Sequence, residues 1–267
     1  MDHQRYDVLI VGGGLAGLCL ARQLLLQSDK SILLLDRRPI PPSRQKVGEA
    51  TVQMSGYYYG KVLDLEEYLL QEHYLKYNLR FYWSSANGPS ERYEELSQSY
   101  IRGLSNIPTY QLDRNKFEDE VLRRNLSFPN FHFVPSSHGL ELDISQGGAA
   151  HRFRFRAEGE AVAGEAGWVV DASGRNKVLQ KKLGLARRSP IRHGTSFAWV
   201  DGLLDIERLT DLSPKERRLR PDRSALGHFP AFLATNHFCG EGFWFWVIPL
   251  HGRTSLGLVY DVDCVPR

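Results

Sequence analysis

Three closely spaced glycines near the N-terminus constrain the fold of this chain more than any other feature. The motif Gly12-x-Gly14-x-x-Gly17 follows the apolar run 6–11 and overlaps residues 15–27, where apolar side chains recur every three or four positions. The run is typical of a buried parallel strand, the recurrence indicates a helix, and residues 31–36 indicate a second strand. The sequence therefore predicts a β-α-β unit with the glycines in the turn between strand and helix.

Each glycine of this motif has its own physical role. Gly12 permits the turn, Gly14 lets the backbone approach a pyrophosphate, and Gly17 brings the helix close to the sheet. The N-terminus of the helix offers unpaired N–H groups and a partial positive charge to a diphosphate. Asp36 lies 19 residues after Gly17 and can accept hydrogen bonds from a ribose. The pattern predicts a dinucleotide site, and the alternative is a glycine-rich turn in an ordinary α/β protein.

The motif alone does not separate NAD from FAD. An acidic residue at position 36 disfavours a 2′-phosphate on the ribose, although Arg37 and Arg38 stand directly beside it. The choice between the two dinucleotides therefore depends on other parts of the chain.

Composition excludes several other classes of protein. The 267 residues are 42% hydrophobic, which is enough for a sizeable core, and 34 basic against 31 acidic residues predict neither a nucleic acid nor a membrane as partner. The three cysteines lie far apart, with no CxxC pair and no histidine cluster at ligand spacing. We therefore expect no metal, no disulfide framework and a cytoplasmic location. The longest apolar run, 8–21, is shorter than the about 20 residues that span a bilayer, and it lacks a processing site.

Downstream patterns predict further elements. The proline cluster at 39, 41 and 42 breaks regular structure, and the basic stretch 215–223 is expected to be a solvated surface. Asp113 is expected to cap a helix whose inner face carries Phe117, Val121 and Leu122. The other expected elements are a helical stretch ending at 73, strands at 79–83 and 109–112, a hairpin over 139–158 around Gly147-Gly148, and a buried strand at 168–172.

Five motifs occur in the order found in flavin-dependent halogenases. They are Gly12-x-Gly14-x-x-Gly17, Gly48-Glu49-Ala50, Leu112-Asp113-Arg114, Asp171-Ala172-Ser173-Gly174-Arg175 and Trp244-Phe245-Trp246-Val247-Ile248-Pro249. Many flavoproteins share the first and the fourth, whereas Trp-x-Trp-x-Ile-Pro is far more specific to halogenases. Over almost its whole length, the chain thus resembles the tryptophan halogenase-like, flavin-dependent halogenases of the FAD-dependent monooxygenase superfamily.

The resemblance implies an α/β fold and FAD as the dinucleotide. A Rossmann-like FAD-binding domain (1–50 and 109–185) would be interleaved with an α+β substrate-side domain (51–108 and 186–267) that is incomplete at its C-terminus. The implied cofactor contacts are Gly12, Gly14, Gly17, Asp36 and Arg37, with Glu49 and Ala50 near the flavin, Arg114 at the diphosphate or adenosine, and Asp171, Gly174 and Arg175 in a second contact region. Arg114 could instead pair with Glu118, and Asp171 could simply cap a turn.

The resemblance also implies a reaction. In this family reduced FAD and oxygen form a flavin hydroperoxide, chloride or bromide attacks it, and the resulting hypohalous acid travels to an electron-rich aromatic ring. Lys76 has the register of the family's lysine, whose ammonium hydrogen-bonds hypohalous acid or, once neutral, forms a haloamine. The alternative is a solvated lysine at a helix end.

Trp244 and Trp246 are two residues apart on a predicted strand and should face the same side. By resemblance they form a wall that keeps the substrate away from the flavin, while the alternative is a pair of core or dimer-interface aromatics. Pro249 is expected to stop further pairing of this strand.

The implied partners are an aromatic small molecule, free or tethered to a carrier protein, and a separate flavin reductase, because no second nucleotide motif is visible. A homodimer is compatible with the sequence. Family members usually continue with a Gly-Asp-Ala-type segment and a halide-binding loop, so we expect a piece of a longer protein, a half protein completed by a partner, or a non-catalytic remnant. Two other function classes stay open: a flavin-dependent hydroxylase or reductase, and a non-catalytic nucleotide-binding fragment or interaction protein.

Overall fold

The computed structural model describes residues 4–39, 45–85, 90, 92–101, 103, 105–219 and 231–264. Two parts of the predictions lie outside these residues: the prolines at 41 and 42, which are expected to break regular structure, and the end of the basic stretch, 220–223. The chain divides into two compact units, each made of two chain segments. The first unit contains Met1–Val47 and Arg114–Arg188, and the second contains Gly48–Asp113 and Ser189–Arg267. The assignment of cofactor and substrate domains to chain segments stays a prediction.

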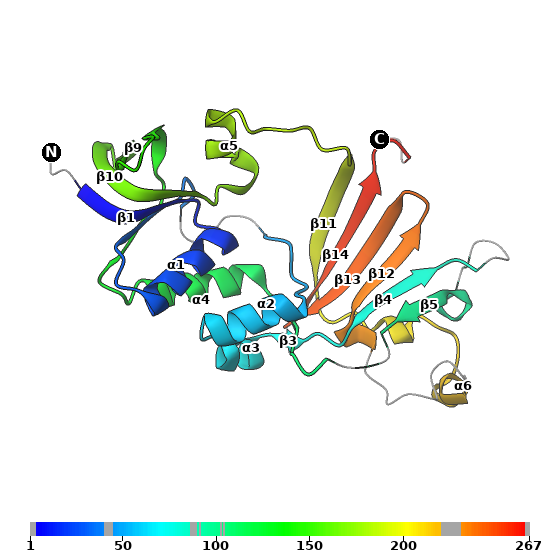
Figure 1. Cartoon of the computed structure of the whole chain (residues 1–267). Helices are drawn as coiled ribbons and strands as arrows, with labels where there is room; N and C mark the ends of the chain where they lie inside the picture. Colours follow the sequence, from blue (N-terminus) through cyan, green and yellow to red (C-terminus); the bar gives the residue numbers. More distant parts are fainter. Residues whose placement is uncertain are drawn as a thin grey trace. The chain divides into compact units, whose positions relative to one another are not determined.

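The first unit is built on a six-stranded sheet in the order β7-β2-β1-β10-β9-β8, part of which can be followed in Figure 1. The four strands β7, β2, β1 and β10 are parallel, and β9 and β8 add an antiparallel hairpin. The strands are β1 (Gln4–Val11), β2 (Ile32–Leu35), β7 (Phe131–Val134), β8 (His138–Asp143), β9 (His151–Ala157) and β10 (Glu160–Asp171), and the helical segments are α1 (Leu15–Gln27), α4 (Arg114–Asn125), η3 (Gly174–Asn176) and α5 (Val178–Lys182). The predicted β-α-β unit, the hairpin and the α/β fold class are confirmed.

Helix packing in this unit follows from apolar spacing. Phe117 and Val121 of α4 are fully buried, as their spacing predicts. The side-chain amide of Asn125 donates to the carbonyl of Leu18 at 3.0 Å and so joins α4 to α1. These contacts hold the helix that follows the glycine turn against its neighbour.

The expected burial of the strand at 168–172 is wrong. Trp168 is 73% exposed, although it lies inside β10. The antiparallel partner β9 pairs with β10 only up to Ala166, so beyond that residue the described part of the ladder has β1 on one side alone. A strand that loses one neighbour also loses the side chains that would cover it.

The second unit contains a six-stranded sheet in the order β11-β14-β13-β12-β4-β5, visible side by side in Figure 1, and a small sheet of β3 and β6. The predicted strands at 79–83 and 109–112 are present as β4 and β6. The strands are β3 (Tyr74–Leu75), β4 (Leu79–Trp83), β5 (Ser97–Tyr100), β6 (Tyr110–Gln111), β11 (His193–Asp201), β12 (Thr235–Gly240), β13 (Phe243–Leu250) and β14 (Arg253–Asp261). The helical segments are α2 (Gln53–Tyr57), η1 (Tyr58–Val62), α3 (Glu66–Glu72), η2 (Tyr93–Glu95), η4 (Ile206–Arg208), α6 (Pro214–Leu219) and η5 (Ala231–Leu233).

The helical stretch ending near residue 73 is interrupted. An α-helical turn, a π-helical segment and α3 follow one another, with a turn at 63–64 between the last two. Asp64 has a φ of 56°, a left-handed conformation that cannot continue an α-helix.

Among the described residues, no helix is both long and apolar enough to cross a membrane.

The two faces of the six-stranded sheet in the second unit differ in character. One face carries a core of Tyr82, Tyr93, Ile206, Ala231 and Val247. Because side chains alternate along a strand, residues one position away from Tyr82 and Val247 face the other side. We call this opposite side the aromatic face, since it carries Phe81, His237, Trp244 and Trp246.

The expectation that Pro249 ends the ladder is wrong. Pro249 pairs with Thr254 of β14, and β13 continues to Leu250. The other neighbour, β12, pairs with β13 only up to Val247 among the described residues. Since N–H groups of an antiparallel strand point alternately to its two sides, a proline is tolerated where one side has no partner.

Candidate functional site

The turn between β1 and α1 contains three glycines. At Gly12 and Gly17 a side chain would clash with the backbone, whereas Gly14 has open space beside it. Gly12 has a φ of +117°, and a Cβ there would lie 2.4 Å from the carbonyl oxygen of Ala172. A Cβ at Gly17 would lie 2.0 Å from the carbonyl oxygen of Gly12. At Gly14, by contrast, an added Cβ would find one described atom within 4 Å, a guanidinium nitrogen of Arg38 at 3.9 Å. Gly14 therefore keeps room in front of the turn.

The helix that follows this turn presents uncapped amides. Gly14 is the N-cap residue of α1, with no side-chain hydrogen bond to the first turn and no acidic residue within it. The first N–H groups of a helix have no partner inside the helix and carry a partial positive charge. This end of α1 is suited to a diphosphate.

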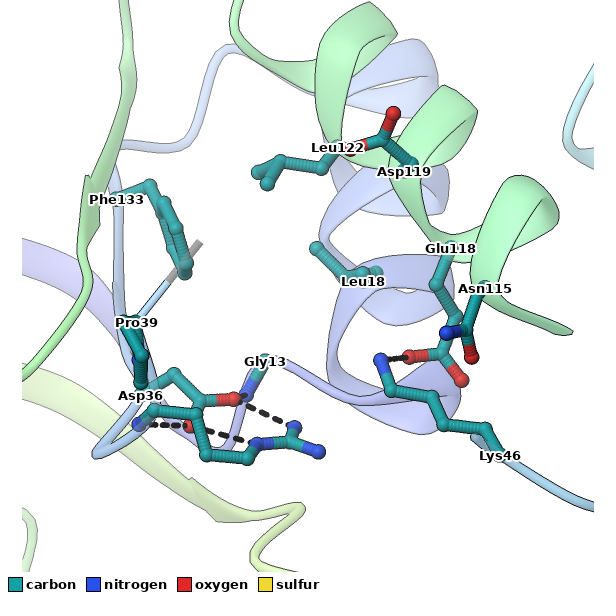
Figure 2. Close-up of a pocket in the computed structure, with 11 residues that line it drawn as sticks. Gly13, Leu18, Asp36, Pro39, Lys46, Asn115, Glu118, Asp119, Leu122 and Phe133 are labelled. Atoms are coloured by element: carbon teal, nitrogen blue, oxygen red, sulfur yellow. Dashed lines mark hydrogen bonds and ion pairs between the residues drawn. The ribbon is translucent and has the colours of Figure 1, made fainter. Parts of the chain in front are cut away.

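The carboxylate of Asp36 already accepts four hydrogen bonds (Figure 2). Oδ2 accepts from the backbone N of Gly13 at 2.9 Å and from Nη2 of Arg38 at 2.7 Å. Oδ1 accepts from the backbone N and from Nε of Arg38, at 2.8 and 3.1 Å. Burial alone would raise the pKa of Asp36, but these bonds outweigh burial and lower it. A carboxylate has about four lone-pair positions, so a ribose could bond Asp36 only if Arg38 moved.

A buried ion cluster lies on the other side of a small cavity (Figure 2). Glu118 of α4 has a side chain only 3% exposed, and it pairs with both Lys46 and Arg114. Arg114 also donates to the carbonyl of Val47 at 3.0 Å. The alternative pairing of Arg114 with Glu118 is therefore present, whereas its contact with FAD stays a prediction. The cavity measures about 40 Å³, which suits a few waters and not a nucleoside.

Asp171 organises the turn that follows β10. Its carboxylate accepts from the backbone N of Ser173 at 3.0 Å and from the backbone N of Leu179 at 2.8 Å. Burial would raise the pKa of Asp171, but these hydrogen bonds together lower it. The alternative role of Asp171 in capping a turn is thus present, with Gly174 at a φ of +59° and Arg175 exposed.

The predicted cofactor residues of the first unit meet at one edge of its sheet. The backbone N of Gly12 donates to the carbonyl oxygen of Leu35 at 2.8 Å, and the backbone N of Ala172 donates to the carbonyl oxygen of Val11 at 2.9 Å. Arg37 donates to Asn176 at 3.2 Å and so joins the end of β2 to the turn after β10. The ends of β1, β2 and β10 therefore lie together at the carboxyl edge of the parallel strands, where open α/β sheets bind ligands.

Glu49 and Ala50 belong to the second unit. Glu49 is 1% exposed, and Oε1 accepts from the indole Nε1 of Trp199 at 3.2 Å. Its other oxygen accepts from the backbone N of Gly48 at 2.8 Å, and Ala50 forms a bridge with Gln111. Glu49 is thus held firmly, and its place near a flavin stays a prediction.

Lys76 lies between β3 and β4 and not at a helix end. Its backbone N donates to the carbonyl of Thr109 at 2.7 Å, and its ammonium donates to the carbonyl of Thr51. The side chain is half-buried, and this burial lowers the pKa of Lys76 to about 8. A lysine with this pKa can take both protonation states near neutral pH.

The two predicted tryptophans share the aromatic face but have different surroundings. Trp246 is 8% exposed, and its Nε1 donates to Oγ of Ser255 at 3.2 Å. Trp244 is half-buried and lies edge-on to His193, with ring centroids 5.6 Å apart. Trp244 also lines a cavity of about 540 Å³, together with Phe81, His193, His237, Cys239 and Asp261. Part of the predicted wall therefore borders a cavity large enough for a small aromatic molecule.

His237 was not predicted, yet it occupies the middle of the aromatic face. It lies opposite Phe81 in the ladder with β4 and opposite Trp246 in the ladder with β13. Its ring stacks on Phe81, with centroids 4.9 Å apart and planes 15° from parallel. A lone histidine in an apolar strand gives no local signal, because its partners come from strands distant in the sequence.

Comparison with known proteins supports the predicted resemblance. The chain is 28% identical, over 97% of its own length and 45% of the other protein, to flavin-dependent halogenase chlA of Dictyostelium discoideum. Halogenase PltM in complex with phloroglucinol and FAD is similar in structure (TM-score 0.74, 21% identity, 97% of this chain and 52% of that one). A flavoprotein/dehydrogenase from Cytophaga hutchinsonii is similar as well (TM-score 0.71, 20% identity, 97% of this chain and 56% of that one).

The resemblance to flavin-dependent halogenases is confirmed by these relatives, and the likeness to the solved structures shows the fold. The chain spans about half the length of the proteins that it matches. The FAD dependent oxidoreductase family matches residues 7–199, which is more than half of the chain. This protein therefore belongs to the FAD-dependent oxidoreductase family.

Proposed function

We propose that this chain carries the cofactor turn and the reactive lysine of a FAD-dependent halogenase that acts on an electron-rich aromatic ring. The observation that carries the proposal is the half-buried Lys76, with a pKa of about 8, whose charge acts on His237 of the aromatic face. The charge of Lys76 reaches His237, which lines the cavity of about 540 Å³. A proton donor that acts electrostatically on a residue of an aromatic-lined cavity suits the transfer of a halogen from hypohalous acid to a ring.

The first unit fits FAD at the turn after β1. The open space at Gly14 and the uncapped amides of α1 would receive the diphosphate, and Asp36 would take the ribose after Arg38 moves away. Arg37, Gly174 and Arg175 would border the same edge. Bound FAD, supplied in its reduced form, would provide with molecular oxygen the oxidising power that converts chloride or bromide to hypohalous acid.

The chain's own side chains would then direct that oxidant. The Lys76 ammonium would hold hypohalous acid by a hydrogen bond and would donate a proton as the halogen leaves the oxygen. Trp244 and Trp246 would separate the substrate from the flavin, which suppresses direct oxygenation of the ring. The aromatic walls of the cavity would bind the ring by stacking.

The first experiment is a titration of the purified chain with FAD, followed by a halide-dependent assay with reduced FAD and an electron-rich arene. Lys76→Ala should abolish ring halogenation while flavin oxidation and hypohalous acid release continue. Lys61→Ala is a suitable control, because Lys61 is exposed and pairs with Glu66 in the same unit. The proposal fails if FAD does not bind, or if Lys76→Ala halogenates the ring like the parent.

A flavin-dependent hydroxylase or reductase is the second candidate. The structural likeness to a flavoprotein/dehydrogenase favours it, since the same fold serves more than one flavin chemistry. An oxygenated or reduced product formed without halide would support this candidate over the halogenase.

We further propose a separate flavin reductase as electron source, an aromatic substrate that is free or tethered to a carrier protein, and a cytoplasmic location. The three cysteines are all free, which is the state of thiols in a reducing compartment. Supplying reduced FAD chemically should replace the reductase. Sedimentation of the purified chain would decide between a monomer and a homodimer.

A further inference from the structure

His237 lies where a base would serve the proposed reaction. It sits between Phe81 and Trp246 on the aromatic face and lines the cavity of about 540 Å³. We propose that His237 accepts the proton that leaves the ring carbon when a halogen takes its place. The inference rests on the proposed halogenase function and adds to Lys76 a second catalytic residue.

The orientation of the imidazole ring is fixed on two sides. Stacking on Phe81 sets its plane, and Nδ1 contacts the carbonyl oxygen of Arg80 at 3.4 Å. A carbonyl oxygen can only accept a hydrogen bond, so Nδ1 must carry the proton in this contact. The lone pair of the neutral imidazole therefore lies on Nε2, the nitrogen that remains available as a base.

The surroundings of His237 also favour its neutral form. Burial lowers the pKa of His237 most strongly, and the charge of Lys76 lowers it further. Backbone hydrogen bonds with Arg80 and Thr235 oppose this shift without reversing it. The protonated form is thus disfavoured before reaction.

The other titratable groups that line the cavity are less suited to this role. Burial raises the pKa of the Cys239 thiol, so it stays protonated. His193 is exposed to water and edge-on to Trp244. Asp261 lies at the end of β14, opposite His193 in the ladder, and its Oδ1 already accepts from the backbone N of Asp263 at 2.9 Å. His237 is the member of this set that is both held in place and flanked by aromatic rings.

Lys76 and His237 together balance the protons of the reaction. A ring π electron pair forms the carbon–halogen bond, the oxygen–halogen bond breaks, and the Lys76 ammonium protonates the departing hydroxide to water. The ring C–H bond then breaks, its electron pair restores aromaticity, and the proton passes to Nε2 of His237. Proton exchange with water finally restores the neutral imidazole and the Lys76 ammonium. The sum is one arene and one hypohalous acid giving one haloarene and one water.

The direct test compares His237→Gln with the parent chain. Glutamine keeps an N–H that can reach the Arg80 carbonyl but offers no basic nitrogen. General-base catalysis contributes about 100-fold or more, so ring halogenation should fall by at least that factor while FAD binding and hypohalous acid release stay unchanged. A ring-deuterated substrate should show a larger isotope effect in His237→Gln than in the parent. His138→Gln, an exposed change in the first unit, serves as the control.

Two outcomes separate the inference from the function on which it rests. If the parent chain halogenates the ring and His237→Gln does so equally fast without a larger isotope effect, His237 is not the base. If the parent chain binds FAD but releases no hypohalous acid, the halogenase function itself fails. Independently of activity, nitrogen-15 NMR of the imidazole should find the proton on Nδ1, and a proton on Nε2 would overturn the assignment.

Discussion

Gly257 lies directly opposite Trp246 in the ladder between β13 and β14, and a Cβ at Gly257 would lie 2.1 Å from the indole ring. The absence of a side chain at Gly257 therefore makes room for the large ring. This pairing explains how Trp246 can be buried within the aromatic face.

Gly257→Ala should consequently destabilise the second unit. The methyl group would push the indole of Trp246 off its rotamer, and overpacking of this kind costs about 1 to 3 kcal/mol. Denaturant unfolding would measure the loss. Gly103→Ala is the control, because an added Cβ there meets no described atom within 4 Å, so its unfolding should match the parent. Equal stability of the two variants would contradict the prediction.

Gly14→Ala and Gly17→Ala should separate ligand binding from folding. A Cβ at Gly17 collides with the backbone of Gly12, so Gly17→Ala should lower the free energy of unfolding. Gly14 has space and a φ of −91°, so Gly14→Ala should change stability by about 0.5 kcal/mol or less. Its methyl group would instead occupy the space proposed for the diphosphate and should weaken FAD binding about tenfold or more. Unchanged FAD affinity in Gly14→Ala would place the diphosphate elsewhere.

Asp36→Asn should change how stability depends on pH. The folded pKa of Asp36 lies below its unfolded value of about 3.9, so the charged carboxylate stabilises the fold above that value. This stabilisation is lost as pH falls through the folded pKa. Asp36→Asn should therefore be less stable than the parent at pH 7, and the difference should shrink in acid. Unfolding curves at pH 7 and pH 3 provide the comparison, and a constant difference would argue against it.

Lys76→Met should be more stable than the parent at pH 8, because burial disfavours the Lys76 ammonium. Burial lowers the folded pKa of Lys76 to about 8, below the unfolded value of about 10.4. Between these values the unfolded chain binds the proton and the folded chain does not, so the stability of the parent rises with pH. Lys76→Met should lack this rise, and its advantage over the parent should shrink from pH 8 to pH 10. A pH-independent difference would show that Lys76 is not desolvated.

Trp244→Ala and Trp246→Ala should differ in stability. Trp246 is buried, and its truncation should cost about 3 to 5 kcal/mol. Trp244 is half-buried at the cavity, so Trp244→Ala should cost less and should mainly alter flavin reoxidation, hydrogen peroxide release and product distribution. Equal losses of stability would refute the distinction between the two rings.

Local patterns were enough to predict the parts of the fold that depend on neighbours in the sequence. The β-α-β unit, the hairpin around Gly147-Gly148 and the strand at 79–83 follow from apolar periodicity and turn residues. The exposure of Trp168 and the continuation of the ladder past Pro249 could not be predicted. Both depend on where a neighbouring strand ends, which is a property of tertiary pairing.

The same division applies to the candidate site. Single residues such as Lys76 and Asp36 could be chosen from motifs, and so could the alternative pairing of Arg114 with Glu118, which is one helical turn long. The position of His237 beside Phe81 and Trp246 required the register of three strands. The hydrogen bonds from the Arg38 guanidinium to the Asp36 carboxylate depend on a side-chain conformation that residue spacing does not specify.

Because Trp168 is exposed, tryptophan fluorescence can follow each unit separately in solution. Of the five tryptophans, Trp168 belongs to the first unit and the other four to the second. A water-soluble quencher such as acrylamide should reach Trp168 before it reaches the buried indole of Trp246. Replacing Trp168 by phenylalanine would leave an emission spectrum from the second unit alone. The difference between the two spectra would then follow the first unit during unfolding or cofactor titration.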